Sequence, residues 1–133
     1  MPFSLAVSAS FTADQVLPGL QFWSRELGVE ITTALAPYGQ ILQTLLDPTS
    51  VFAARPRGAN IILLRVCDWL RELPADAAAS PDFVRQHLQQ ATSDFARAVQ
   101  ACCSRGGTQT FLIVCPSESS TSKPIRSAAR PAL

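Results

Sequence analysis

The sequence has few of the residues that build metal or nucleotide sites. Its 133 residues include one histidine, one methionine and six glycines. The four cysteines form no Cys-x-x-Cys pair, and one histidine with scattered carboxylates gives no ligand spacing for zinc or calcium. Neither GxGxxG nor a GK[ST] phosphate loop is present. We therefore predict no metal site and no cofactor.

Strong charge of either sign is also missing. Eleven basic and ten acidic side chains give a formal net charge of +1, and the basic residues are spread along the chain. Nucleic acid rewards clustered phosphate contacts, so we do not expect it as a partner.

Long apolar runs are absent as well. None approaches the roughly 18 residues that span a bilayer, and the amino terminus lacks the basic region of a signal peptide. We expect a cytoplasmic protein with no membrane association. In that compartment the cysteines should be reduced, and we interpret them as mostly buried thiols.

The chain length and its changes in composition indicate one folded unit. About 100–150 residues is typical of a domain, and residues 1–116 carry all the periodic segments. Residues 117–133 are rich in Ser, Thr, Pro, Arg and Ala, which is typical of a disordered polar tail. The composition is 47% hydrophobic and 16% charged, an apolar surplus that suggests a face for a partner.

Short apolar runs alternate with helical patterns along residues 1–116. The predicted strands are Phe3–Ser8, Val29–Ala34, Asn60–Val66 and Thr110–Cys115, and the predicted helices are 12–27, 39–46 and 80–105. Such alternation favours parallel βαβ units. We predict an α/β fold, a three-layer flavodoxin-like parallel sheet of about four strands with Asn60–Val66 in the centre. Its open edges would allow pairing into a homodimer.

Local signals mark the ends of two helices. Thr12-x-x-Gln15 fits a capping box, although Pro18 would bend that helix or delay its start, and Gly28 should end it. Ser80-Pro81 is a strong start for the last helix. The predicted apolar stripes comprise Val16, Leu20, Trp23 and Leu27 in the first helix and Val84, Leu88, Ala91, Phe95, Ala98 and Cys102 in the last.

Two serines follow the first strand, where a nucleophile or an anion site would lie. Alternatively, Ser8 and Ser10 have a simpler role, in which their hydroxyls form hydrogen bonds with backbone groups of the turn and of the helix cap. A catalytic serine needs a base, and His87, off the apolar stripe, is interpreted as a solvated helix-face residue. Asp68, at the end of the central strand, should face the same rim as the serines, as a polar anchor or as a partner of Arg65.

A wider resemblance follows from a series of segments in a fixed order. They are Leu5–Ala13 (LAVSASFTA), Phe22–Trp23, Leu27–Gly28, Ala36–Gln40 (APYGQ), Gln43–Ser50 (QTLLDPTS) and Gly58–Trp69 (GANIILLRVCDW). This series resembles the amino-terminal region of FkbH-like proteins of the haloacid-dehalogenase superfamily, also found in polyketide synthase and nonribosomal peptide synthetase polypeptides. The resemblance spans about residues 3–114.

The resemblance implies an accessory role. The family's DxDxT-like loading motif is absent from this sequence, so the chain is expected to be a docking domain that engages an acyl carrier protein or a synthase module. The family region looks like an SGNH-hydrolase fold, in which Ser8 or Ser10 and Asp68 would be catalytic. A late Asp-x-x-His pair is missing, so no complete catalytic motif is present. A serine esterase or thioesterase, degenerate or active, and an inactive truncated fragment are the alternatives.

Overall fold

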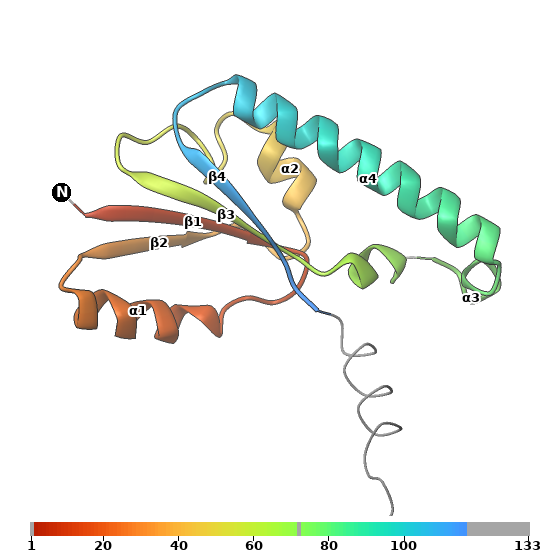
Figure 1. The fold of residues 1–133 in the computed structure, drawn as a ribbon, viewed down its shortest axis with the longest axis horizontal. Coiled ribbons are helices and arrows are strands. Elements are labelled where there is room, and N and C mark those ends of the chain that lie inside the picture. Colours follow the sequence, from red (N-terminus) through yellow and green to blue (C-terminus); the bar gives the residue numbers. More distant parts are fainter. Residues whose placement is uncertain (1, 72, 117–133) are drawn as a thin grey trace, which may run out of the picture.

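The computed structural model describes residues 2–71 and 73–116, which form a parallel sheet with helices on both faces (Figure 1). The four strands are β1 (Phe3–Ala9), β2 (Ile31–Leu35), β3 (Gly58–Leu64) and β4 (Gln109–Val114). Their order across the sheet is β2-β1-β3-β4, and all three pairings are parallel. The predicted α/β class is confirmed, and β3 is an inner strand as expected. The predicted tail, 117–133, lies outside the described residues.

The helices divide between the two faces of the sheet. They are α1 (Val16–Leu27), α2 (Ile41–Leu46), α3 (Ala75–Ala78) and α4 (Pro81–Ser104), with a short 3₁₀ helix, η1 (Val66–Leu70). In Figure 1, α1 lies below the sheet beside β2, and α2 and α4 lie above it. The two sides follow from right-handed crossovers, because the chain moves from β1 to β2 in one direction and from β2 to β3 to β4 in the other.

The main core lies between the sheet and the α2–α4 layer. Its buried members are Ala6, Ile62 and Leu64 of the strands, Ile41 and Leu45 of α2, Phe52, and Phe95, Ala98 and Cys102 of α4. Leu45 and Ile62 are fully buried, and each such aliphatic side chain contributes about 1.5–3 kcal/mol. This core fixes α4 across the sheet and thereby sets one wall of the cavity described below.

The first helix begins later than its capping signal predicts. Its N-cap is Gln15, with no side-chain hydrogen bond at the cap, so the predicted capping box does not form. Pro18 is the third residue of α1, where no intrahelical N–H bond is lost. The delayed start expected from Pro18 is therefore confirmed. Gly28 ends the helix at a φ of 64°, a left-handed conformation that suits glycine.

The predicted stripe of α1 is only partly covered. Trp23 is 57% and Leu27 65% exposed, and α1 has no fully buried residue. The reason is topological, since α1 is the only one of the described helices on its face of the sheet and lies beside the edge strand β2 (Figure 1). An amphipathic pattern predicts which side of a helix is apolar, and not how much of that side finds a partner.

The start of α4 matches its sequence signal. The Ser80 side chain accepts a 3.4 Å hydrogen bond from the N–H of Phe83, and Pro81 is the first helical residue. Of the predicted stripe, only the carboxyl-terminal part from Phe95 onward is fully buried. Figure 1 shows why: the amino-terminal half of α4 extends beyond the sheet.

All four cysteines are free, as expected, but most are not buried. Cys102 is buried, Cys103 is exposed, and Cys67 and Cys115 are intermediate. Adjacent residues on a helix point about 100° apart, so Cys102 and Cys103 cannot share the core side. Among the described helices, none combines the length and the apolar character needed to cross a membrane.

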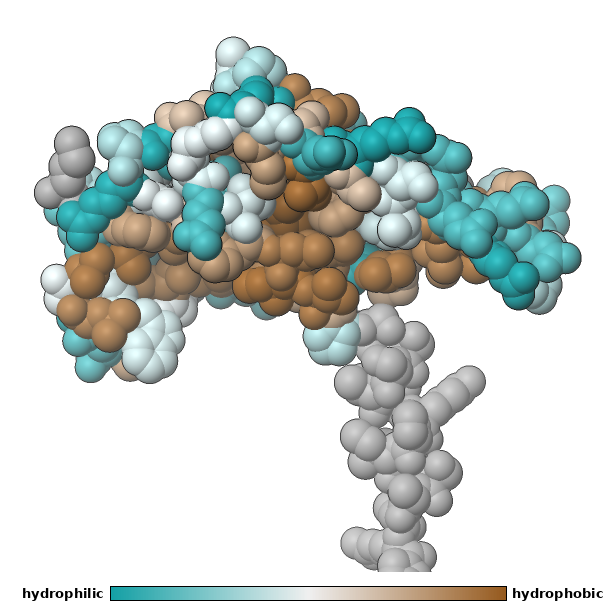
Figure 2. Space-filling view, turned by 45° about the horizontal axis from the view of Figure 1, so that its top comes forward, coloured by the Kyte–Doolittle hydropathy of each residue, from teal (hydrophilic) through white to brown (hydrophobic). Residues whose placement is uncertain are grey.

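Strand β4 is an open edge with apolar side chains on both faces. Phe111, Leu112, Ile113 and Val114 are 47%, 48%, 48% and 61% exposed. Their pairing with Ile61–Leu64 places Phe111 and Ile113 on the α1 side and the other two on the α4 side. In Figure 2 a broad hydrophobic surface adjoins the point where the grey trace begins, at the end of β4. We call these four residues the β4 patch.

Candidate functional site

The candidate site lies where the two inner strands end. Ser10 follows β1 and Arg65 follows β3, and these strands are neighbours in the sheet. From β1 the chain proceeds to β2 on one side, and β3 lies on the other. This is the topological switch point, where open α/β sheets bind ligands. The predicted shared rim for Ser10 and Asp68 is present.

The 3₁₀ helix η1 aligns three charged side chains. With three residues per turn, positions three apart lie one above another. Arg65, Asp68 and Arg71 have this spacing, and the carboxylate lies between the two guanidinium groups. Arg65 Nε is 3.0 Å from Asp68 Oδ2, and Arg71 Nη2 is 3.0 Å from Oδ1. Sequence analysis paired Arg65 with Asp68 but missed Arg71, which the Arg-x-x-Asp-x-x-Arg spacing could have identified.

Ser10 is fixed at the centre of this cluster. Its Oγ donates a 2.7 Å hydrogen bond to Asp68 Oδ2 and accepts a 2.9 Å bond from the backbone N–H of Arg65. The Arg65 guanidinium also lies 4.6 Å from the ring centre of Phe11, a cation–π distance. Ser10 therefore fastens the loop after β1 to the end of β3.

The second carboxylate oxygen of Asp68 is less well paired. The side chain is 4% exposed, and Oδ1 has no hydrogen bond within the described part of the chain. Arg71 Nη2 is close enough for an ion pair, but its N–H groups do not point at Oδ1. Instead Arg71 Nη1 donates a 3.1 Å bond to the hydroxyl of Tyr38. Arg71, 55% exposed, therefore covers a buried acceptor without satisfying it.

A cavity of about 460 Å³ opens beside this cluster, between α2, η1 and α4. Its polar lining includes Ser10, Asp68, Arg71 and His87. His87 is half-buried, and its Nε2 lies 2.8 Å from the carbonyl oxygen of Trp69. A carbonyl only accepts, so Nε2 carries a proton, and in the neutral ring Nδ1 is then the acceptor nitrogen. The interpretation of His87 as a solvated helix-face residue was wrong, because α4 turns this position toward η1.

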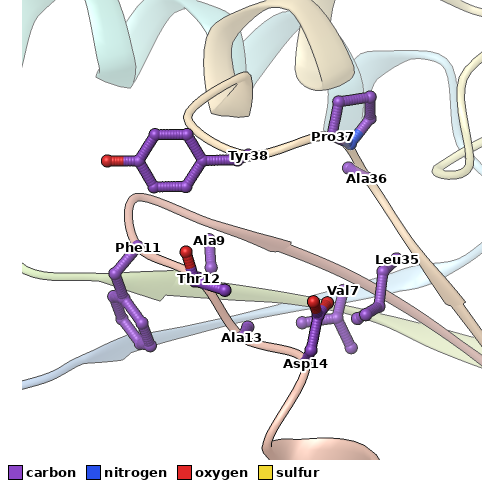
Figure 3. Close-up of a pocket in the computed structure, with 10 residues that line it drawn as sticks. All are labelled: Val7, Ala9, Phe11, Thr12, Ala13, Asp14, Leu35, Ala36, Pro37 and Tyr38. Atoms are coloured by element: carbon purple, nitrogen blue, oxygen red, sulfur yellow. The ribbon is translucent and has the colours of Figure 1, made fainter.

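Tyr38 joins this cavity to two others on the same edge. One, of about 300 Å³, lies between the loops after β1 and β2, where Tyr38 faces Phe11 and Thr12 (Figure 3). The other, of about 450 Å³, is lined by Phe11, Tyr38, Arg65 and Arg71 among others. The carboxyl edge of the sheet is thus hollowed around Tyr38, which entered the sequence analysis only as part of the Ala36–Gln40 segment.

Ser8 lies apart from these cavities. It is fully buried, and its Oγ donates a long 3.5 Å bond to Thr44 Oγ1 beneath α2. Ser8 lies within β1 and points into the main core, whereas Ser10 lies beyond the end of the strand. In this position no substrate can reach Ser8, which leaves Ser10 and Asp68 as the candidate residues.

The chemistry open to the site is limited by its hydrogen bonds. Ser10 donates a hydrogen bond to Asp68, and no hydrogen bond joins Ser10 to His87 in the described part of the chain. A serine is activated by a base within about 2.6–3.2 Å, and among the described residues Asp68 Oδ2, at 2.7 Å, lies at that distance from Ser10 Oγ. Within the described ranges there is also no group of three or more His, Cys, Asp and Glu side chains that could hold a metal.

Comparison with known proteins bears on the fold. No family model and no curated protein matches the sequence. Among solved structures, the fold is similar to the N-terminal part of the protein BF1531 from Bacteroides fragilis, a structure containing a phosphatase domain complexed with Mg. The TM-score is 0.65 at 15% sequence identity, over 97% of this chain and 33% of that chain. The chain therefore spans a third of its neighbour's length and shares an α/β fold with it.

Proposed function

We propose that this chain is an accessory docking domain of the FkbH-like type. In this role it engages an acyl carrier protein or a neighbouring module of a polyketide or nonribosomal peptide synthase. The observation that carries the proposal is the β4 patch, in which every residue from Phe111 to Val114 is about half exposed. Scattered apolar residues on a surface are ordinary, but a contiguous patch marks an interaction site.

The form of the patch indicates how a partner would bind. An edge strand offers a row of backbone donors and acceptors, and its side chains point alternately to the two faces. A partner strand could pair with the backbone of β4 while its own side chains cover Phe111 and Ile113 on one face. This mode, β-augmentation, combines main-chain hydrogen bonds with pockets for side chains.

Two further observations support an accessory role. Ser10 is held in the candidate site by hydrogen bonds to Asp68 and to the backbone N–H of Arg65, which is consistent with a structural role. The similar solved structure is a chain three times as long as this one and contains a phosphatase domain. A domain of this kind would then serve chemistry that is carried out elsewhere in a larger protein or assembly.

The test is a binding experiment with carrier proteins and module fragments encoded near this gene. Isothermal titration with the wild type should give a measurable Kd, and Phe111→Ser should weaken it at least tenfold. Phe83→Ser is the matched control, because Phe83 is 45% exposed against 47% for Phe111 and lies at the start of α4. Failure of every candidate to bind, or equal loss in both variants, would contradict the proposal.

A serine esterase or thioesterase is the second candidate function. One observation favours it: Ser10, Asp68 and His87 line a single cavity. Rotation of the Ser10 hydroxyl away from Asp68 would be required before attack on an acyl carbonyl. Turnover of a chromogenic ester and an acyl thioester, present in the wild type and in Ser8→Ala but lost in Ser10→Ala, would support this candidate. Absence of turnover in all three proteins would remove it.

A further inference from the structure

The cavity of about 460 Å³ beside α4 is lined by two side chains that can accept hydrogen bonds, Asp68 and His87. Asp68 Oδ1 is buried and has no hydrogen bond within the residues described. His87 uses Nε2–H on the carbonyl of Trp69, so its Nδ1 is the nitrogen with a lone pair. A buried acceptor without a donor costs about 1–3 kcal/mol, and a ligand that donates a hydrogen bond would remove that cost.

The other walls of the cavity are apolar. Ile41 and Leu42 come from α2, and Trp69 and Phe95 bring two rings whose centres are 5.9 Å apart. The volume falls in the range of about 300–1,000 Å³ that small-molecule sites occupy, and apolar walls with a few convergent polar groups are typical of them. The cavity therefore suits a compact apolar body with a donor at one end.

The charges around Asp68 decide which donor fits. Its carboxylate already has a guanidinium nitrogen 3.0 Å from each oxygen, those of Arg65 and Arg71. A cationic head would meet the guanidinium group of Arg71, and an anionic head would meet Asp68 itself and Asp94, all of which line the cavity. A neutral hydroxyl donates a hydrogen bond and adds no charge.

We propose that this cavity binds a small neutral alcohol, with an aromatic or aliphatic body, whose hydroxyl donates to Asp68 Oδ1. Arg71 is the movable cover: more than half of its side chain is exposed, and it is held by a bond to the equally exposed Tyr38. Its turn toward solvent opens the carboxylate to the ligand. This site is separate from the β4 patch and does not depend on the docking proposal.

Three probes that share an aromatic ring and differ in the charge of their polar group test the proposal: benzyl alcohol, benzylamine and benzoate. Each is titrated into the full chain and followed by NMR at the Trp69 indole N–H and the Asp68 carboxyl carbon, with Trp23→Phe to assign the indole signal. Benzyl alcohol should shift both signals and bind at least fivefold more tightly than either charged probe. Equal binding of the three, or an unmoved Asp68 carbon, would overturn the assignment.

A pair of variants locates the binding. Ala91→Leu fills the cavity from α4 without removing a hydrogen bond, whereas Ala96→Leu makes the same change on the exposed side of that helix. The first should weaken benzyl alcohol binding at least tenfold, and the second should leave it unchanged. If both variants bind like the wild type, the alcohol lies elsewhere and the proposal is wrong.

Discussion

Ser10 and Asp68 are 58 positions apart in the chain, yet Ser10 Oγ donates a 2.7 Å hydrogen bond to Asp68 Oδ2. The bond closes the gap between the ends of the two inner strands, and the backbone N–H of Arg65 completes it by donating to the same Oγ. Ser10 is thereby part of the frame that holds the switch point in shape.

Replacing each serine in turn distinguishes the stability that comes from the Ser10 hydrogen bonds at the strand ends from the stability that comes from Ser8 in the core. Ser10→Ala removes the acceptor of the Arg65 N–H and one of the hydrogen bonds to Asp68 Oδ2, which keeps its bond from Arg65 Nε. We therefore expect the free energy of unfolding to fall by about 1–3 kcal/mol. Ser8→Ala removes only the 3.5 Å contact with Thr44 and should cost less than about 1 kcal/mol. Urea unfolding of the two variants measures both values. Equal losses would mean that the Ser10 bonds contribute little.

Much of the fold follows from local sequence signals. The aliphatic run of β3, the Ser80-Pro81 start of α4 and the Gly28 end of α1 were predicted because each depends on chemistry within a few residues. The shared rim of Ser10 and Asp68 was also predicted, since it requires only that parallel strands end at the same edge.

The remaining features depend on where whole elements lie. The exposure of Trp23 follows from the position of α1 beside the edge strand β2, which a helical pattern does not encode. The place of His87 depends on how α4 crosses η1, and the cover role of Arg71 depends on the 3₁₀ geometry of a segment that has no strong 3₁₀ signal. The site was therefore half predictable: the sheet edge was expected, and its helical wall was not.

The adjacent pair Cys102 and Cys103 should differ sharply in reactivity. Burial raises the pKa of the Cys102 thiol, with a smaller opposing effect from Arg105, and the thiolate is the reactive form. Cys103 is exposed. A thiol-specific reagent at neutral pH should label Cys103 within minutes and Cys102 only after unfolding, as followed by peptide mass spectrometry. Similar labelling rates for the two residues would contradict the structure.

Acid stability should depend partly on Asp47, which stops α2. Hydrogen bonds from the Thr49 hydroxyl and backbone N–H lower the pKa of this carboxyl below its ordinary value of 3.8. A group whose pKa is lowered by folding stabilises the protein above its unfolded pKa and loses that contribution as the pH falls through the folded value. The melting temperatures of the wild type and Asp47→Asn should therefore differ most above pH 4 and converge toward pH 2. A constant difference would exclude this linkage.

Arg55 is expected to be the surface-loop residue on which the fold depends most. Its guanidinium donates to the carbonyls of Val51, Ala53 and Ala59 and to Asn60 Oδ1, at 2.6 to 3.1 Å. Desolvation lowers its pKa, but an arginine remains charged at neutral pH, so these are charge-assisted bonds.

Arg55→Met keeps the aliphatic stem and removes every donor, which leaves the buried Asn60 with an unpaired oxygen. We expect a loss of about 3 kcal/mol in the free energy of unfolding, measured by urea titration. Arg85→Met on the exposed side of α4 is the matched control and should change stability by less than about 0.5 kcal/mol. Because the Arg55 loop leads directly into β3, the same variant should also increase hydrogen exchange at the amides of β3 and β4, an effect that a merely local loss would not produce.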